Sequence, residues 1–129
     1  MPGNSTFIWN ELVCSDVNTC GDFYADLLGW ERKEVETHDG QPYTIFLKDG
    51  RAIGGMITLQ DAAADTSHWE PYIQVDDVDA YVRKIAPLGG KVLTPPHDVP
   101  EIGRVALISD PSAARLALIT EISQDEELP

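Results

Sequence analysis

An internal repeat, offset by about 60 residues, is the feature that most constrains how this 129-residue chain can fold. Asp16 and Asp77 lie 61 positions apart, and Gly29 and Gly89 lie 60 apart. Acidic residues favour helix starts and glycines favour helix ends, so the two halves have helices in the same relative place. The sequence therefore predicts two copies of one structural unit.

The first half reads as a strand, a helix and three further strands. Asp16 is placed to cap the helix and Gly29 to end it. The apolar stripe predicted for this helix consists of Phe23, Leu27 and Leu28. Strands are predicted at Phe7–Cys14, Trp30–Thr37, Tyr43–Lys48 and Ala52–Leu59, with tight turns at Asp39-Gly40 and Asp49-Gly50.

The second half repeats this order. Asp77 is placed to cap a helix, and Leu88-Gly89-Gly90 is placed to end it. The apolar residues of this helix are Val78, Tyr81, Val82 and Ile85. Strands are predicted at Trp69–Val75, Lys91–Thr94, Arg104–Ser109 and Arg115–Glu121, with a turn at Asp110-Pro111-Ser112-Ala113.

One β-α-β-β-β unit leaves a curved sheet face that its single helix does not cover, and two copies can face each other across that hollow. We therefore predict an α+β fold with two tandem βαβββ modules forming a curved mixed sheet around a cavity. A single domain over residues 1–129 would hold modules at about 7–59 and 69–121, a polar linker at 60–68 and an acidic tail at 122–129. The linker could instead be a helical turn within a continuous sheet.

Charge and composition limit the partners and the location. The chain has 9 Lys and Arg against 22 Asp and Glu, a net charge of −13 that repels phosphate backbones and anionic lipid heads. We expect neither a nucleic-acid nor a membrane partner. The N-terminal residues resemble no secretion signal, and no apolar run approaches the roughly 18–20 residues that span a bilayer, so we expect a cytoplasmic protein.

The only two cysteines, Cys14 and Cys20, are six positions apart. Two thiols are too few for a disulfide framework or a four-thiolate zinc site. We interpret both as reduced residues that pack as small hydrophobes.

The repeat and several short motifs resemble the vicinal oxygen chelate superfamily, which includes glyoxalase I, bleomycin-resistance proteins and extradiol dioxygenases. The resemblance covers about Phe7 to Glu121. It is carried by Cys14-Ser15-Asp16-Val17, Phe23-Tyr24, Leu27-Leu28-Gly29-Trp30, Val75-Asp76-Asp77-Val78-Asp79-Ala80, Leu88-Gly89-Gly90-Lys91-Val92 and Asp110-Pro111.

A closer likeness is to the glyoxalase-like branch often labelled "putative hydroxylase". It is carried by Trp9-Asn10-Glu11-Leu12, Gly54-Gly55-Met56, Trp69-Glu70-Pro71-Tyr72, Pro95-Pro96-His97-Asp98 and Gly103-Arg104. Ala113 stands where the family turn usually has glycine, so we expect this turn to avoid positive φ.

Metal-dependent members of this superfamily hold a divalent ion with four side chains, one from the first and one from the last strand of each module. In this chain the resemblance maps those positions to Trp9, Gly55, Glu70 and Ala117. Only Glu70 can ligate, and a lone carboxylate does not hold such an ion against water. We therefore predict no metal and no other cofactor.

The three histidines do not restore a ligand set, because no pair has a metal-binding spacing. His38 adjoins a predicted turn, His68 lies in the linker, and both are interpreted as surface residues. His97 follows two prolines in a predicted loop where family members line the cleft, which makes it a candidate ligand-binding residue.

Strand alternation predicts which side chains face the cavity. On the first strand Trp9, Glu11 and Val13 share a face, while Leu12 and Cys14 face the helix. On the first strand of the second module, Ile73 and Val75 face the helix. The candidate catalytic residues are Glu11 and Glu70, and the candidate ligand-binding residues are Trp9, Met56, Tyr72, Gln74, His97 and Arg104.

Each of these assignments has a plainer alternative. Trp9 and Tyr72 could fill the cavity as ordinary core, and Glu11 and Glu70 could point past the sheet edge into solvent. Arg104 could pair with one of the glutamates, clamp an anionic ligand group or lie on the surface.

Three functions remain open at this point. The leading hypothesis is a domain that binds a small, cationic or aromatic organic molecule in a metal-free cleft, with acid/base catalysis by a cavity glutamate as an extension. A purely sequestering antibiotic-resistance binder is the second. A metal-dependent lyase or dioxygenase is the third, and the missing ligands argue against it. The resemblance also implies a homodimer.

Overall fold

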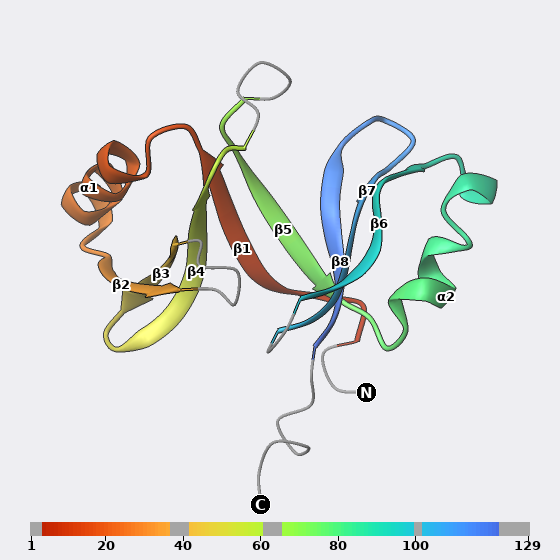
Figure 1. The fold of residues 1–129 in the computed structure, drawn as a ribbon, viewed down its shortest axis with the longest axis horizontal. Helices are drawn as coiled ribbons and strands as arrows, with labels where there is room; N and C mark the ends of the chain where they lie inside the picture. Colours follow the sequence, from red (N-terminus) through yellow and green to blue (C-terminus); the bar gives the residue numbers. More distant parts are fainter. Residues whose placement is uncertain (1–3, 37–41, 61–65, 100–101, 122–129) are drawn as a thin grey trace, which may run out of the picture. The chain divides into compact units, whose positions relative to one another are not determined.

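The computed structural model describes residues 4–36, 42–60, 66–99 and 102–121, which fall into two compact units (Figure 1). The N-terminal unit comprises Trp9–Glu70, and the C-terminal unit comprises residues 1–8 together with Pro71–Pro129. The predicted turn at Asp39-Gly40, His38, linker residues 61–65 and the acidic tail lie outside the described residues.

The N-terminal unit has the predicted β-α-β-β-β order. Its strand order is β2-β3-β4-β1, with β1 parallel to β4 and the other pairs antiparallel. The elements are β1 (Thr6–Cys14), α1 (Val17–Leu28), β2 (Glu31–Glu36), β3 (Pro42–Lys48) and β4 (Arg51–Thr58).

The C-terminal unit repeats this topology. Its strand order is β5-β8-β7-β6, with β5 parallel to β8 and the other pairs antiparallel. The elements are β5 (His68–Gln74), α2 (Val78–Val82), a 3₁₀ turn η1 (Ala86–Leu88), β6 (Lys91–Val99), β7 (Gly103–Ser109) and β8 (Arg115–Glu121). The predicted pair of βαβββ modules and the α+β class are thus confirmed.

The helix boundaries follow the predicted caps. The Asp16 carboxylate accepts a hydrogen bond from the Thr19 backbone N–H at 3.1 Å, and Asp77 accepts one from Ala80 at 3.3 Å. Gly29 has φ 74°, a left-handed conformation that glycine adopts at low cost, and its N–H donates to the Ala25 carbonyl. Local chemistry therefore decides where α1 begins and ends.

The buried face of α1 differs from the predicted one. Phe23 and Leu27 are 55% and 61% exposed, so the predicted stripe of Phe23, Leu27 and Leu28 faces outward. The face against the sheet consists of Val17, Cys20, Gly21 and Tyr24. These residues follow the i, i+3, i+4, i+7 spacing, and their small members let the helix lie close to the sheet.

Each helix covers a core on one face of the strands of its own unit. Leu12 and Cys14 pack beneath α1 with Phe46 and Met56, as the alternation of β1 predicted for the first two. Val75 packs beneath α2 with Val78, Ala106, Ile108 and Leu118, and Ile73 lies against this cluster. Cys14 and Cys20 are free thiols as predicted, and burial raises the pKa of Cys14 to about 11.

Two elements of the C-terminal unit differ from the prediction. The helix after Asp77 ends at Val82 instead of reaching Ile85, and it is followed by a 3₁₀ turn that contains Pro87, a residue with no backbone N–H to donate. His97 lies in β6, not in a loop, paired with Val105 of β7. The ladder shifts register between Thr94 and His97, which accommodates two prolines on an edge strand.

No described helix has the length and apolar character needed to traverse a lipid bilayer.

The turn between β7 and β8 overturns one expectation. Ala113 has φ 76°, so the residue that replaces the family's usual glycine still adopts the left-handed conformation. Asp110 compensates by accepting hydrogen bonds from the backbone N–H groups of Ser112 and Ala114. The turn geometry is therefore imposed by Asp110, although alanine is poorly suited to this backbone.

We predict that Ala113→Gly stabilises the protein by about 1 kcal/mol, since glycine adopts this backbone without the steric cost of a Cβ. Urea unfolding followed by circular dichroism measures the change. Ala114→Gly is the matched control, because Ala114 is exposed and has no positive φ. A destabilised Ala113→Gly variant would contradict the assignment of strain to this turn.

Candidate functional site

The sheet face opposite α1 carries the polar residues of the N-terminal unit. Leu12 and Cys14 point toward α1, so Trp9 and Glu11 lie on the opposite face of β1. On β3, Phe46 belongs to the core beneath α1, which places Tyr43 and Ile45 on that opposite face too. We call the surface formed by Trp9, Glu11, Tyr43 and Gly55 the distal face.

The Tyr43 hydroxyl joins the side chains of the distal face. The indole Nε1 of Trp9 donates a hydrogen bond to it at 3.0 Å. The hydroxyl in turn donates to the carboxylate of Glu11, a residue that is only 7% exposed. An indole, a phenol and a buried carboxylate therefore form one hydrogen-bonded cluster.

The surroundings of Tyr43 in this cluster raise the pKa of its phenol. Burial raises it most, and the negative charge of Glu11 raises it further, while the hydrogen bond from Trp9 acts in the opposite direction. The phenol thus stays protonated and continues to donate to Glu11. That donation gives the buried Glu11 carboxylate a hydrogen-bond partner, which a buried polar group needs.

Gly55 makes room for the phenol. It is the register partner of Glu11 on β1 and of Ile45 on β3. A Cβ on Gly55 would overlap the Tyr43 hydroxyl, so no other residue fits there while the ring keeps its position. The phenol fills the space where a side chain at position 55 would stand.

Tyr43 was not among the predicted site residues. The signal that could have found it is the hairpin at Asp49-Gly50, whose pairing brings Ile45 opposite Gly55. Tyr43 lies on the same face two residues before Ile45, so it is a diagonal neighbour of that glycine.

The second candidate carboxylate, Glu70, has a histidine partner. His68 Nε2 lies 3.2 Å from Glu70 Oε1, and His68 Nδ1 lies 2.6 Å from the Thr66 carbonyl oxygen. Glu70 is 9% exposed. The expectation that His68 lies on the surface is wrong, since it is the first residue of β5 and is partly buried.

The corresponding sheet face of the C-terminal unit is apolar. Tyr72 packs there against a buried cluster of β7 and β8 side chains, and Ala117 is its register partner. The Gln74 amide donates to the Val75 carbonyl, and its Oε1 is buried without a hydrogen-bond partner in the described part of the chain. The cluster consists of Val105, Ala117 and Ile119, with Ile8 and Val99 packed against it.

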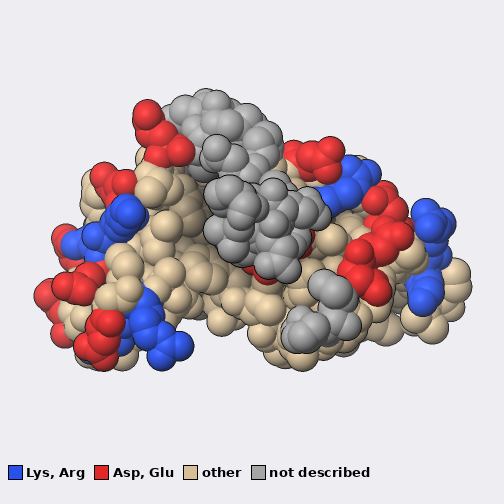
Figure 2. Space-filling model, turned by 90° about the horizontal axis from the view of Figure 1, so that it is seen from below, with Lys and Arg blue, Asp and Glu red and all other residues tan. Residues whose placement is uncertain are grey.

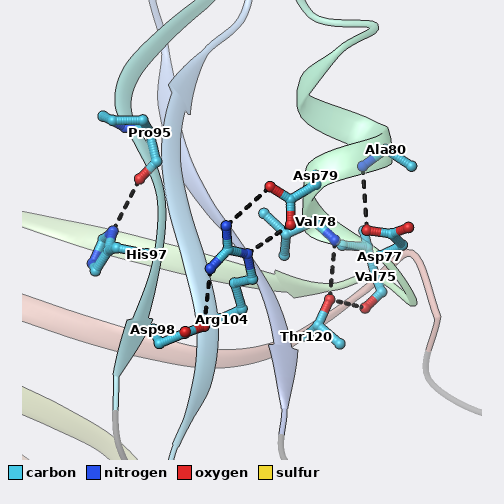
Figure 3. A network of polar contacts seen from close by, with 10 residues as sticks. All are labelled: Val75, Asp77, Val78, Asp79, Ala80, Pro95, His97, Asp98, Arg104 and Thr120. Atoms are coloured by element: carbon cyan, nitrogen blue, oxygen red, sulfur yellow. Dashed lines mark hydrogen bonds and ion pairs between the residues drawn. The ribbon is translucent and has the colours of Figure 1, made fainter.

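Met56 and His97 lie away from these clusters. Met56 is 2% exposed in the core beneath α1, because its strand position alternates with Gly55. His97 is exposed on β6, and its ring Nδ1 lies 3.0 Å from the Pro95 carbonyl oxygen (Figure 3). We include neither in the candidate site.

Arg104 joins β7 to α2 and β6 (Figure 3). Its guanidinium donates to the Asp79 carboxylate at 2.6 and 3.1 Å and to Asp98 at 3.0 Å. These contacts raise the pKa of Arg104 and hold that of Asp79 below its usual value. The described ion pairs of Arg104 are thus with aspartates, not with the predicted glutamates, and two carboxylates already neutralise the guanidinium.

Three of the four positions that the resemblance maps to metal ligands have no side chain suited to ligation. Gly55 and Ala117 offer no donor side chain, and the Trp9 indole nitrogen donates to Tyr43. Within the described ranges no group of three or more His, Cys, Asp and Glu is arranged to hold a metal ion.

Acidic and basic side chains are interspersed on the face of the molecule seen in Figure 2. Most of the blue lysine and arginine side chains lie beside red carboxylates. The chain as a whole carries a net charge of −13.

Comparison with known proteins identifies the family. Residues 6–118 match the model of the Glyoxalase/Bleomycin resistance protein/Dioxygenase superfamily. The chain belongs to this superfamily. The resemblance seen in the sequence motifs is therefore confirmed, and the matched segment covers both modules.

Two relatives have informative names. The Mycobacterium tuberculosis protein called "Putative glyoxylase CFP32" is 35% identical over 119 residues, 92% of this chain and 45% of that protein. The Streptomyces peucetius anthracycline biosynthesis protein DnrV is 30% identical over 123 residues, 85% of this chain and 45% of that protein. The chain spans about half the length of these relatives.

Solved structures of methylmalonyl-CoA epimerases share the fold. The Mycobacterium tuberculosis enzyme has a TM-score of 0.65 at 15% identity, covering 95% of this chain and 91% of that one. The Streptomyces coelicolor enzyme, in a variant complexed with 2-nitronate-propionyl-CoA, has a TM-score of 0.60 at 19% identity, covering 91% and 97%. The Streptomyces coelicolor epimerase is thus a protein of this fold whose structure holds a CoA ester.

We predict that Glu11→Gln lowers the pKa of Tyr43, because the substitution removes the charge that opposes phenolate formation. The pKa is measured by alkaline ultraviolet titration, with the Tyr43→Phe titration subtracted to isolate this phenol. Glu34→Gln, which neutralises an exposed residue of β2, is the control. An unchanged Tyr43 titration in Glu11→Gln would show that the two groups do not interact.

We also predict that Gly55→Ala destabilises the protein by about 1–3 kcal/mol through overlap with the Tyr43 ring. Removal of the ring should relieve the overlap, so Gly55→Ala should cost much less in a Tyr43→Ala background. A double-mutant cycle of urea unfolding measures the coupling. Additive effects of the two substitutions would contradict the proposed packing.

Proposed function

We propose that this domain binds a small organic molecule with an aromatic body and a positive charge on the distal face of its N-terminal unit. The observation that carries the proposal is the cluster of Trp9, Glu11 and Tyr43 over Gly55. Trp9 offers a stacking surface, and Glu11 offers a charge. No metal-ligand side chain is needed for either role.

The energetics favour a cationic aromatic ligand. A cation over an aromatic ring is stabilised by about 0.5–2 kcal/mol, more strongly where water is excluded. The carboxylate of the nearly buried Glu11 adds a Coulomb attraction that surrounding solvent screens only weakly. The overall charge of −13 draws cations toward the protein before they reach this face.

The same cluster supports acid/base catalysis as an extension of binding. Glu11 is the candidate general base, and the Tyr43 hydroxyl orients its carboxylate. A ligand with an acidic C–H next to a carbonyl would offer such a proton. Glu11 would take the proton, and the C–H electron pair would remain on the ligand as an enolate.

The relatives support this choice of ligand class. DnrV is named for the biosynthesis of anthracyclines, which are planar aromatic compounds. This chain spans 45% of CFP32 and 45% of DnrV. An activity of either whole protein is therefore attributed to this chain only as part of this proposal.

The test compares 1-methylquinolinium with its uncharged analogue 1-methylnaphthalene by isothermal titration calorimetry and tryptophan fluorescence. We expect the cation to bind more tightly, and Glu11→Gln to weaken it about tenfold, which corresponds to about 1.4 kcal/mol. Binding of the uncharged analogue should change little. Glu34→Gln is the control for general loss of negative charge.

Several outcomes would count against the proposal. Equal affinity for both probes, or the same loss in Glu11→Gln and Glu34→Gln, would refute a specific role of Glu11. Binding that appears only with added Ni²⁺, Mn²⁺ or Fe²⁺ would support a metal-dependent member instead. If the cation binds but no carbonyl compound is turned over, a sequestering role is favoured over catalysis.

A further inference from the structure

The two cysteines of the chain meet between β1 and α1. Cys14 is the last residue of β1 and is fully buried, whereas Cys20 lies in the first turn of α1 and is partly exposed. The S–H group of Cys14 donates a hydrogen bond to the sulfur of Cys20. Two thiols six positions apart are therefore in direct contact inside the N-terminal unit.

The backbone on both sides holds this contact in place. The Cys14 carbonyl accepts a hydrogen bond from the Leu59 N–H at 2.8 Å, which ties the end of β1 to the residue after β4. The Asp16 carbonyl accepts one from the Cys20 N–H at 3.0 Å, which fixes the first turn of α1. The Asp16 backbone N–H also donates to the Cys14 sulfur. The two sulfur atoms are thus brought together by local backbone structure on either side of a short turn.

The surroundings of the pair favour a disulfide over other oxidised forms of cysteine. Cys14 belongs to the same buried cluster as Phe46 and Met56, and Cys20 packs against that cluster. A disulfide brings neither a charge nor a hydrogen-bond donor into this core, whereas a sulfinic acid at Cys14 would place an anion there. Because the thiols already touch, an S–S bond of about 2.05 Å requires only a closer approach of the two sulfurs.

The different exposure of the two thiols sets the order of reaction. Cys20 is partly exposed, so it can meet an oxidant dissolved in the solvent. Cys14 is 0% exposed, and burial raises its pKa to about 11, so at neutral pH it stays a protonated thiol and a poor nucleophile. The first attack on an oxidant thus belongs to Cys20, and the second step belongs to Cys14.

We infer that Cys14 and Cys20 form an oxidation site, at which a small disulfide such as oxidised glutathione produces an intramolecular disulfide between β1 and α1. In a reducing compartment the pair stays a dithiol, and an oxidising challenge closes it. The inference does not rest on the proposed function, because Cys14 faces α1 whereas Glu11 lies on the distal face.

The atoms and electrons of this reaction balance. The Cys20 thiolate attacks one sulfur of oxidised glutathione, whose S–S bond breaks to give a mixed disulfide and one glutathione thiolate. Cys14 then loses its proton, and its sulfur attacks the sulfur of Cys20 and expels the second glutathione thiolate. The two protons released by the cysteines are taken up by the two glutathione thiolates. The cysteine pair is oxidised by two electrons, and glutathione is reduced by the same number.

The test exposes the folded protein to oxidised glutathione and follows it by intact mass spectrometry and peptide mapping. We expect the wild type to lose two hydrogens and to carry no stable glutathione adduct. Cys14→Ala should accumulate a mixed disulfide at Cys20, because the thiol that completes the reaction is missing. Cys20→Ala is the matched control and should stay unmodified, since its remaining thiol is buried.

Three outcomes would overturn the inference. The first is a wild type that stays reduced, and the second is a wild type that accumulates the glutathione adduct. The third is a Cys20→Ala variant that is modified as fast as Cys14→Ala, because the buried thiol would then react without its neighbour.

A second measurement uses the wild type alone and so does not depend on whether a variant folds. Mixtures of reduced and oxidised glutathione give the equilibrium constant for forming the disulfide, once in the folded protein and once in urea that unfolds it. Because the folded chain already holds the sulfurs in contact, we expect this constant to be about tenfold larger in the folded protein. An equal or smaller constant in the folded protein would show that the native geometry resists the bond, and the inference would fail.

Discussion

The pairing of β1 with β4 is the constraint on which the candidate site depends. These strands are parallel neighbours, and their register sets Glu11 beside Gly55. Alternation along β1 sends Leu12 and Cys14 into the core beneath α1, so Glu11 must face the other way. A shift by one residue would bury the carboxylate under the helix and expose the core, which makes this register strongly preferred.

The two units show how one topology can carry different chemistry. Both have a parallel strand pair at one end of their four-strand order and a helix over one face. On the opposite face, the N-terminal unit has the polar cluster around Tyr43, whereas the C-terminal unit has an apolar cluster around Ala117. Strand order is set by the repeated caps and turns, but the chemistry is set by the few residues that project from that face.

Features with a local cause were predictable from the sequence. The helix caps at Asp16 and Asp77 depend on one side chain and its neighbours in the chain, and the alternation of β1 follows from strand geometry. The outward position of Phe23 and the role of Tyr43 were not predictable in this way, because both depend on what packs across the sheet. The prediction that Ala113 avoids positive φ was wrong for a related reason, since the hydrogen bonds to Asp110 outweigh the backbone preference of alanine.

Because a side chain at position 55 would overlap the Tyr43 phenol, the residue at each of these two positions limits what the other can be. A lineage that carries the tyrosine cannot gain a ligating residue at 55 in one substitution without displacing the ring. The aromatic residue would have to be lost first, and with it the hydrogen bonds to Trp9 and Glu11. The packing of this pair thus opposes any single substitution that would place a side chain at position 55.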